Sequence, residues 1–207
     1  MIRAFDADVV VVPEAFRDPD GSAVLDPLRD DGYEITSTLF RRIEAHDGVT
    51  DLRPAGEWEL SVCSRLPVVA VRHIPLVPVF RDHAERRAAI SCTVDVGGAE
   101  VDVVGVHLSS KLWFGGPAVH LRGLRPMLPP PDRPAVVAGD CNLWGPGVLA
   151  LLRGWRRAVV GRTYPANRPH SQIDHILVND RVEVLDGRVL HDVGSDHRPV
   201  VARLRVR

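Results

Sequence analysis

The sequence predicts a mixed α+β fold in which strands outnumber helices. Apolar, β-branched runs of strand length recur along the 207 residues, and two glycine-containing turns between such runs indicate hairpins. Short helical segments lie between several of the runs. Hairpins join antiparallel strands, whereas intervening helices allow parallel ones, so we expect a mixed sheet architecture and not a purely parallel one.

The expected strands follow in chain order. Residues 7–12 carry a continuous β-branched run, which is typical of a strand buried on both faces. Residues 89–96 and 99–106 flank Gly97-Gly98, which predicts a hairpin with a glycine turn. Further strands are expected over residues 134–138, 173–178, 182–190 and 199–206. Within the third of these, Asp186-Gly187 is a second hairpin signal.

Three short helices are expected between the strands. The first covers residues 22–29 and is weakened by Pro27. The second covers residues 117–127, because proline is tolerated at the first helical position, and Pro126 should end it. The third covers residues 146–152.

The composition describes an ordinary globular chain, 45% hydrophobic and 26% charged, with a formal net charge of −1. There is no overall basic field to attract a polyanion, although a local arginine patch remains open. No apolar run approaches a membrane span, and the first residues lack the apolar core of a secretory signal. We therefore expect a cytoplasmic monomer without an obligate protein partner.

The three cysteines, Cys63, Cys92 and Cys141, lie in apolar surroundings without CxxC spacing. Their odd number and spacing favour buried, reduced thiols over a disulfide framework or a zinc cluster.

Polar residues stand at the ends of several expected strands, where apolar packing does not call for them. Each has an ordinary explanation when taken alone, such as a turn, a helix cap or a solvated side chain. A carboxylate inside an apolar strand, as at Asp174, is harder to dismiss, because burial is costly unless a cation or histidine pairs with it. The set comprises Glu14, His107, Asp140, Asn142, Asp174, Asp196 and His197.

Taken together and in this order, the segments that carry these residues resemble the endonuclease/exonuclease/phosphatase superfamily. That superfamily includes apurinic endonucleases, pancreatic-type deoxyribonuclease, sphingomyelinases and inositol-polyphosphate 5-phosphatases. The resemblance implies a four-layer α/β/β/α sandwich with two packed mixed β-sheets, formed by a single domain over residues 1–207. The six matching segments are Ala7–Glu14, Ser64–Val68, Val106–Ser109, Gly139–Asn142, Ile173–Leu177 and Ser195–Pro199.

The resemblance also implies a site for a divalent metal. Glu14 would be the main direct ligand, and Asp196 would lie close to the metal or its waters. Asp140 and Asn142 would orient the attacking water and the phosphate. An all-oxygen donor set suits Mg²⁺, with Mn²⁺ as the other candidate, and argues against zinc.

Two histidines complete the implied site. Asp174 and His197 would form a carboxylate–imidazole pair that contacts the phosphate. His107 occupies the place of a histidine that, in the deoxyribonuclease branch, is thought to protonate the leaving oxygen. Its carboxylate partner would be Glu57 or Glu59. Together with Asn142 and His107, Arg65 is expected to bind the substrate.

The chain departs from the family pattern at its start. Family members begin with a strand that ends in an asparagine, before the strand that carries the metal glutamate. Here the chain starts almost at the second strand, and Pro13 replaces the usual glutamine before Glu14. We expect a chain truncated relative to the family, with an unpaired edge beside residues 9–12. A degenerate member that binds without cleaving is the other reading.

Several functions share the implied chemistry. A phosphodiesterase or nuclease is favoured, and a phosphomonoesterase or phospholipase-like enzyme on lipid or inositol phosphates is the alternative. The chain lacks the Gly-x-Ser-x-Gly turn of serine hydrolases and the phosphate-binding loop of nucleotide triphosphatases. Residues 111–116 combine the only lysine with two aromatics, which could stack on a base, cover an apolar substrate or pack against the following helix.

Overall fold

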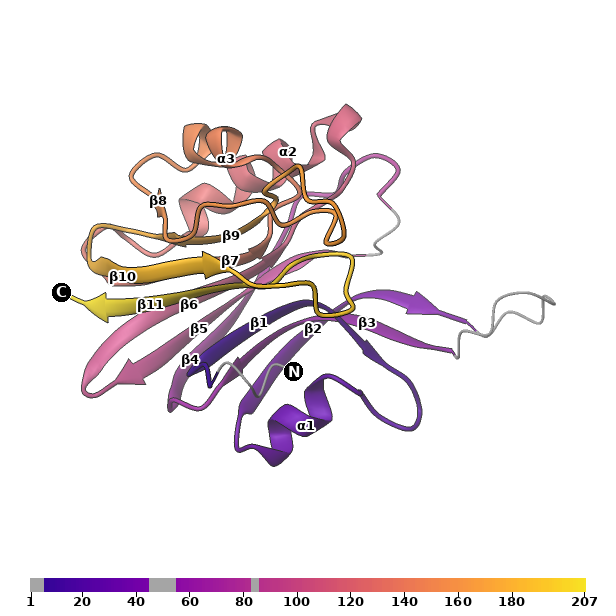
Figure 1. Ribbon diagram of the computed structural model, residues 1–207, viewed down its shortest axis with the longest axis horizontal. Coiled ribbons are helices and arrows are strands. Elements are labelled where there is room, and N and C mark those ends of the chain that lie inside the picture. The colour runs from indigo at the N-terminus through magenta and orange to yellow at the C-terminus, as the bar shows by residue number, and fades with distance from the viewer. Residues whose placement is uncertain (1–5, 45–54, 83–85) are drawn as a thin grey trace.

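The computed structural model describes residues 6–44, 55–82 and 86–207. Two layers of β-strands pack face to face in its centre, with α2 and α3 outside one layer and α1 outside the other (Figure 1). The expected four-layer sandwich of helix, sheet, sheet and helix is confirmed.

One layer is a six-stranded sheet in the order β4-β5-β6-β7-β9-β8. β6 and β7 run parallel, while every other neighbouring pair in this sheet is antiparallel. The strands are β4 (Val68–Pro75), β5 (Ala88–Val96), β6 (Ala99–His107), β7 (Ala135–Asp140), β8 (Arg156–Arg157) and β9 (Asp174–Val178).

The other layer has two antiparallel parts, a three-stranded sheet in the order β1-β3-β2 and the pair β10-β11. Within the described residues β1 pairs with β3 alone, so its other edge carries no strand, as expected. The strands are β1 (Val9–Arg17), β2 (Glu34–Ile43), β3 (Gly56–Ser64), β10 (Val182–Val189) and β11 (Val200–Val206).

The helices are short and cover the outer faces. α1 (Leu25–Asp30) places Leu25 and Leu28 against the three-stranded sheet. α2 (Gly116–Leu124) and α3 (Gly145–Leu151) cover the six-stranded sheet, and Leu121 and Val148 are fully buried there. As expected, α2 ends before Pro126, and the chain continues as the 3₁₀ turn η3 (Arg125–Met127).

One expected hairpin is confirmed and the other is wrong. Val96 pairs with Ala99 across Gly97 and Gly98, whose φ angles of 63° and 93° suit the tight turn. In contrast, Asp186-Gly187 lies inside β10, which continues to Val189. A Cβ on Gly187 would lie 2.0 Å from the carbonyl oxygen of Ala158, so this glycine permits a close backbone approach and not a turn.

The cysteine prediction holds, since Cys63, Cys92 and Cys141 are buried and free. Among the described residues, no helix has the length and apolar character needed to cross a bilayer.

Candidate functional site

Three of the predicted site residues lie in register across neighbouring strands. His107, the last residue of β6, is opposite Asp140, the last residue of the parallel strand β7. Asp140 is in turn opposite Asp174, the first residue of the antiparallel strand β9. All three side chains are buried, with residue exposures of 5%, 6% and 8%. The sheet thus fixes their relative positions through its backbone hydrogen bonds.

Glu14 reaches this row because β1 contains a β-bulge. Val12 pairs with Ser61 and Ala15 pairs with Glu59, so β1 has one residue more than β3 between these pairs. The extra residue falls at Pro13-Glu14, and proline suits a bulge because it cannot donate a ladder hydrogen bond. The bulge directs the Glu14 carboxylate to His107, with 3.4 Å between Oε1 and Nε2.

A second bulge at the same level supports His107. Leu39 pairs with Glu59 and Arg41 pairs with Trp58, which leaves Phe40 as the extra residue of β2. The Phe40 ring is buried and packs edge-on against the His107 ring, with 4.9 Å between centroids.

A tight turn after β7 holds Asp140 and Asn142 together. Gly139 has a φ of 133°, and a Cβ there would lie 2.0 Å from the carbonyl oxygen of Val106, so no other residue fits. Asn142 adopts a left-handed φ of 47°, and its backbone N–H donates to Asp140 Oδ1 at 2.7 Å. Its side-chain amide donates to Asp140 Oδ2 and to the carbonyl oxygen of Leu108, both at 2.9 Å.

His197 faces the buried carboxylate of Asp174. Its Nδ1 lies 2.9 Å from Oδ2 and 3.1 Å from Oδ1, and the Tyr164 ring packs 4.9 Å from the imidazole. Partial burial disfavours the imidazolium, but the hydrogen bond to Asp174 and the charges of Asp174, Asp140 and Asp196 outweigh it. They raise the pKa of His197 to about 9, so the imidazole is cationic at neutral pH.

The carboxylates repel one another. Burial, together with the charge of Asp174, raises the pKa of Asp140. Partial burial and the charge of Asp196 raise the pKa of Glu14. Asp196 itself is exposed and follows Ser195 in the loop before β11. Such a cluster binds protons or cations more readily than isolated carboxylates do.

The surroundings of His107 differ from the expectation. Glu57 pairs with Arg42 and Glu59 with Arg17, so the prediction that one of these glutamates partners His107 is wrong. The carboxylates nearest its Nε2 belong to Glu14 and, at 3.9 Å, Asp140.

The Nδ1 of His107 is buried and, within the described residues, has no hydrogen-bond partner. Burial, then the charge of Arg87, lowers the pKa of His107 to about 3, so the ring is neutral near pH 7.

Arg87 and Asp82 form a buried ion pair next to the backbone of His107, and the sequence did not predict it. Arg87 donates to both carboxylate oxygens of Asp82 at 2.9 and 3.3 Å, and the two side chains are 10% and 8% exposed. The same guanidinium donates to the backbone oxygen of His107 at 3.3 Å and lies 5.2 Å from the Phe40 ring centroid. The bulge in β2 places Phe40 against His107 and Arg87, and no sequence pattern predicts this bulge.

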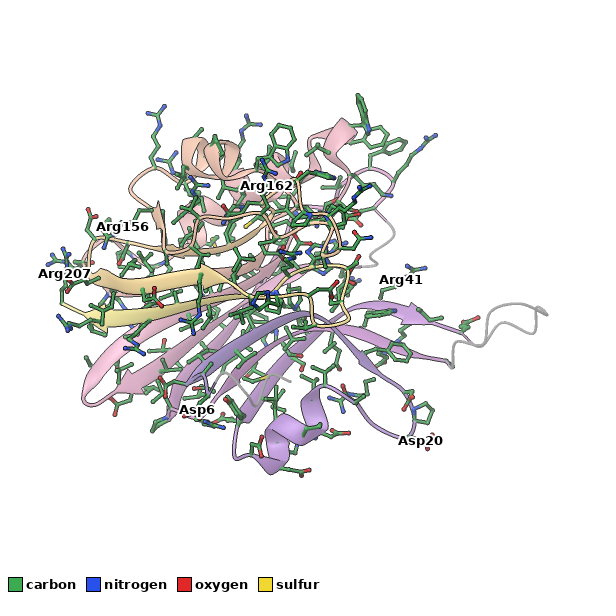
Figure 2. The ribbon with its side chains drawn as sticks, viewed as in Figure 1. Asp6, Asp20, Arg41, Arg156, Arg162 and Arg207 are labelled. Carbon is green, nitrogen blue, oxygen red and sulfur yellow. The ribbon has the colours of Figure 1, made fainter. Side chains whose placement is uncertain are left out.

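Arg65 does not join the other predicted site residues. Its guanidinium bonds Asp6 and stacks 4.5 Å from the Tyr33 ring, beside the start of β1. Figure 2 shows Asp6, the partner of Arg65, far from Arg41 near the other end of the three-stranded sheet.

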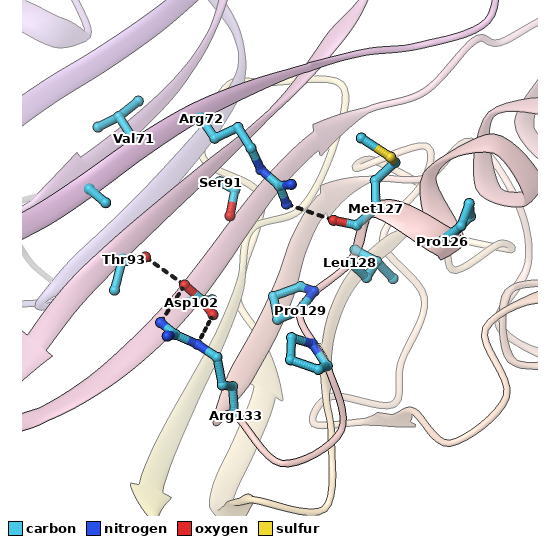
Figure 3. Close-up of a pocket in the computed structure, with 12 residues that line it drawn as sticks. Val71, Arg72, Ser91, Thr93, Asp102, Pro126, Met127, Leu128, Pro129 and Arg133 are labelled. Atoms are coloured by element: carbon cyan, nitrogen blue, oxygen red, sulfur yellow. Dashed lines mark hydrogen bonds and ion pairs between the residues drawn. The ribbon is translucent and has the colours of Figure 1, made fainter.

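A separate cavity of about 400 Å³ lies away from these residues (Figure 3). Asp102 lines it and pairs with Ala135 at the start of β7, whereas the site lies at the ends of β6 and β7. Thr93 and Arg133 both donate hydrogen bonds to Asp102, so the buried carboxylate in this cavity already has partners within the protein.

The donor set at the candidate site fits a hard divalent cation. Oxygen or nitrogen atoms of Asp140, Asp174 and His197 lie within 4.8 Å of one another. Asp174 engages Nδ1 of His197, and the carboxylates around this ring supply the hard oxygen donors. Carboxylate oxygens suit Mg²⁺ or Mn²⁺, and a bound cation would offset the burial and the mutual repulsion that raise the pKa values of Glu14 and Asp140.

Residues 1–197 match the model of the endonuclease/exonuclease/phosphatase family. The chain belongs to this family. No curated protein matches this chain.

Solved structures of the family share the fold. An endonuclease/exonuclease/phosphatase from Beutenbergia cavernae DSM 12333 is 27% identical with a TM-score of 0.80. The match covers 99% of this chain but 64% of that protein, so the chain spans less than two thirds of its length. A family protein from Leptotrichia buccalis C-1013-b is 14% identical with a TM-score of 0.72, covering 99% and 89% of the two chains.

A structure of sphingomyelinase C from Streptomyces griseocarneus is 19% identical with a TM-score of 0.67. That match covers 96% of this chain and 84% of the sphingomyelinase. At this identity the likeness concerns the fold alone.

Proposed function

We propose that this chain is a divalent-metal-dependent hydrolase of phosphodiester bonds. The observation that carries the proposal is the row of His107, Asp140 and Asp174, with the cationic His197 bound to Asp174. A positive imidazole beside a cluster of carboxylates offers both a phosphate contact and metal ligands. One domain of the family, formed by residues 1–207, would carry the activity.

Glu14, Asp196 and Asp140 are the residues that would hold Mg²⁺ or Mn²⁺. When bound, the metal supplies a Lewis acid that neutralises phosphate charge. The raised pKa values of Glu14 and Asp140 support this assignment, because they reflect burial of the carboxyl groups and, after it, the negative charge of neighbouring carboxylates.

The other residues would position and stabilise the phosphate. His197 would donate a charge-assisted hydrogen bond from Nε2 to a phosphate oxygen, while Asp174 holds the ring through Nδ1. Asn142 and Asp140 would orient the attacking water, because the turn fixes both side chains. The neutral His107 would fix the Glu14 carboxylate through Nε2.

A substrate panel tests this proposal. The chain is incubated with Mg²⁺ or Mn²⁺ and with plasmid DNA, an abasic duplex, bis-p-nitrophenyl phosphate or p-nitrophenyl phosphate. Turnover of a diester, lost in His197→Ala, would support the proposal, with Arg65→Ala as the control expected to retain activity. Turnover of the monoester alone would favour a phosphomonoesterase. No metal-dependent turnover on any substrate would favour a binding member of the family.

A further inference from the structure

Exposed apolar side chains gather at one projecting tip of the molecule. The tip consists of Phe80, Leu112, Trp113 and Phe114, which are 68%, 54%, 99% and 45% exposed. The Phe80 and Phe114 rings meet edge to face with 5.4 Å between centroids. Packing against the following helix, one of the three readings of residues 111–116, is therefore wrong for Trp113.

Two separate loops form the tip. Phe80 and Arg81 are the central residues of a turn closed by a hydrogen bond from the Asp82 N–H to the Val79 oxygen. Leu112–Phe114 form the 3₁₀ turn η2, which follows β6 and ends at Gly115, where φ is 66°. In Figure 1 the chain around η2 projects at the upper right, beyond α2.

A buried histidine joins the two loops. His120, on α2, is 1% exposed, and its Nδ1 accepts a hydrogen bond from the Ser109 N–H at 3.1 Å. Its Nε2 lies 2.9 Å from the carbonyl oxygen of Val77, so the neutral Nε2–H tautomer satisfies both contacts. The exposed side chains are thus carried on a braced scaffold.

The tip also adjoins the candidate site. The Leu108 oxygen, at the start of the loop that carries η2, accepts a hydrogen bond from the Asn142 side chain. Asp82, at the end of the Phe80 turn, pairs with Arg87, which bonds the His107 backbone. A surface bound by the tip would therefore lie next to the site.

We propose that this tip docks on an anionic lipid surface. Leu112 is aliphatic and has no π face, so base stacking does not explain its exposure, whereas an interfacial layer accommodates aliphatic and aromatic groups together. Arg81 is exposed with its guanidinium 5.3 Å from the Phe80 ring centroid, and Lys111 is half-buried beside Leu112. Apolar residues flanked by cations match an anionic headgroup layer.

The shape of the tip supports the same occupant. Trp113 is almost fully exposed within the short turn η2, and a deformable lipid layer can surround such a side chain without a complementary pocket. The inference concerns docking and does not depend on the catalytic proposal.

Vesicle co-sedimentation tests the inference, with vesicles of phosphatidylcholine mixed with phosphatidylglycerol or of phosphatidylcholine alone. The protein is expected to bind the mixed vesicles and to bind the neutral ones more weakly. Trp113→Ser should weaken binding about tenfold, which is the effect of withdrawing one large apolar side chain. The matched control is Trp144→Ser, which removes another exposed tryptophan, 64% exposed and outside the tip, and should bind within about twofold of the original chain.

Thermal melting and hydrolysis of soluble bis-p-nitrophenyl phosphate accompany the binding assay. Trp113→Ser should leave both unchanged, which separates a failure of docking from a failure of the catalytic proposal. Absence of binding to the mixed vesicles, or equal binding by Trp113→Ser, would overturn the inference. The inference would also be overturned if Trp113→Ser left vesicle binding unchanged and instead weakened binding of oligothymidylate or self-association of the protein.

Discussion

Nδ1 of His197 lies within 3.1 Å of both carboxylate oxygens of Asp174. Asp174 is held in turn by the backbone of β9, and its N–H donates to Thr163 Oγ1 at 3.3 Å. The histidine comes from a loop and the aspartate from a strand, so the pair joins the candidate site to the rigid sheet.

Replacing Asp174 by asparagine should lower the pKa of His197 from about 9 toward or below its ordinary value. The substitution removes the negative charge and leaves the partial burial that disfavours the imidazolium. Histidine NMR resonances followed against pH measure this change. Asp102→Asn is the control, because Asp102 is buried at the other end of β6 and should leave the His197 titration unchanged.

The same pair should make stability depend on pH. The folded-state pKa of His197 lies above the ordinary value of 6.5, so the pair stabilises the fold fully below about pH 6.5. That contribution, on the order of 1–3 kcal/mol, should be lost as the pH rises through about 9. Urea unfolding of the original chain and Asp174→Asn, both in chelator, would show their difference shrinking over that window. A constant difference would contradict the assignment.

Gly139→Ala should destabilise the protein by more than about 2 kcal/mol, because the new Cβ would meet the Val106 carbonyl at a positive φ. Gly97→Ala is the matched control. It also has a positive φ, but no atom lies within 4 Å of its Cβ, so it should cost only about 1 kcal/mol. Free energies of unfolding in urea measure both, and equal losses would show that the close approach is unimportant.

Arg87→Leu should destabilise the fold by about 3–5 kcal/mol, because it removes the guanidinium from a buried ion pair with Asp82. The double variant Arg87→Leu with Asp82→Leu should recover part of that loss, since it removes the buried carboxylate as well. A double-mutant cycle measured by urea unfolding gives the coupling. Additive effects would mean that Arg87 and Asp82 are not energetically coupled.

His120→Phe should weaken vesicle binding without removing any exposed side chain. Phenylalanine fills much of the same buried space but cannot bond Ser109 and Val77, so the two loops of the tip lose their shared anchor. The phosphatidylglycerol vesicle assay measures the change. If binding stayed unchanged while the variant remained folded, the brace would have no role in docking.

The sequence predicts β1, β5, β6, β7, β9, β10 and β11 and most of the candidate site, because hydrophobic runs and polar strand ends are local patterns. It does not predict β2, β3, β4 or β8. His107, Asp140 and Asp174 are predicted by their places at strand ends, and registry across the sheet brings them together. Glu14 lies inside β1 and not at a strand end, and the bulge in β1 turns it toward His107. No local pattern reveals the bulge that turns Phe40 inward or the pairing of Arg87 with Asp82, since both depend on contacts between strands. Arg65 was predicted from a segment match, but its partners Asp6 and Tyr33 hold it elsewhere.

The most direct test of the central proposal is the metal dependence of bis-p-nitrophenyl phosphate hydrolysis by the original chain and by Glu14→Gln. The proposal predicts saturable activation by Mn²⁺ or Mg²⁺, complete loss in chelator, and a need for at least about tenfold more metal in the variant. Turnover that persists in chelator, or the same metal requirement in Glu14→Gln, would contradict it.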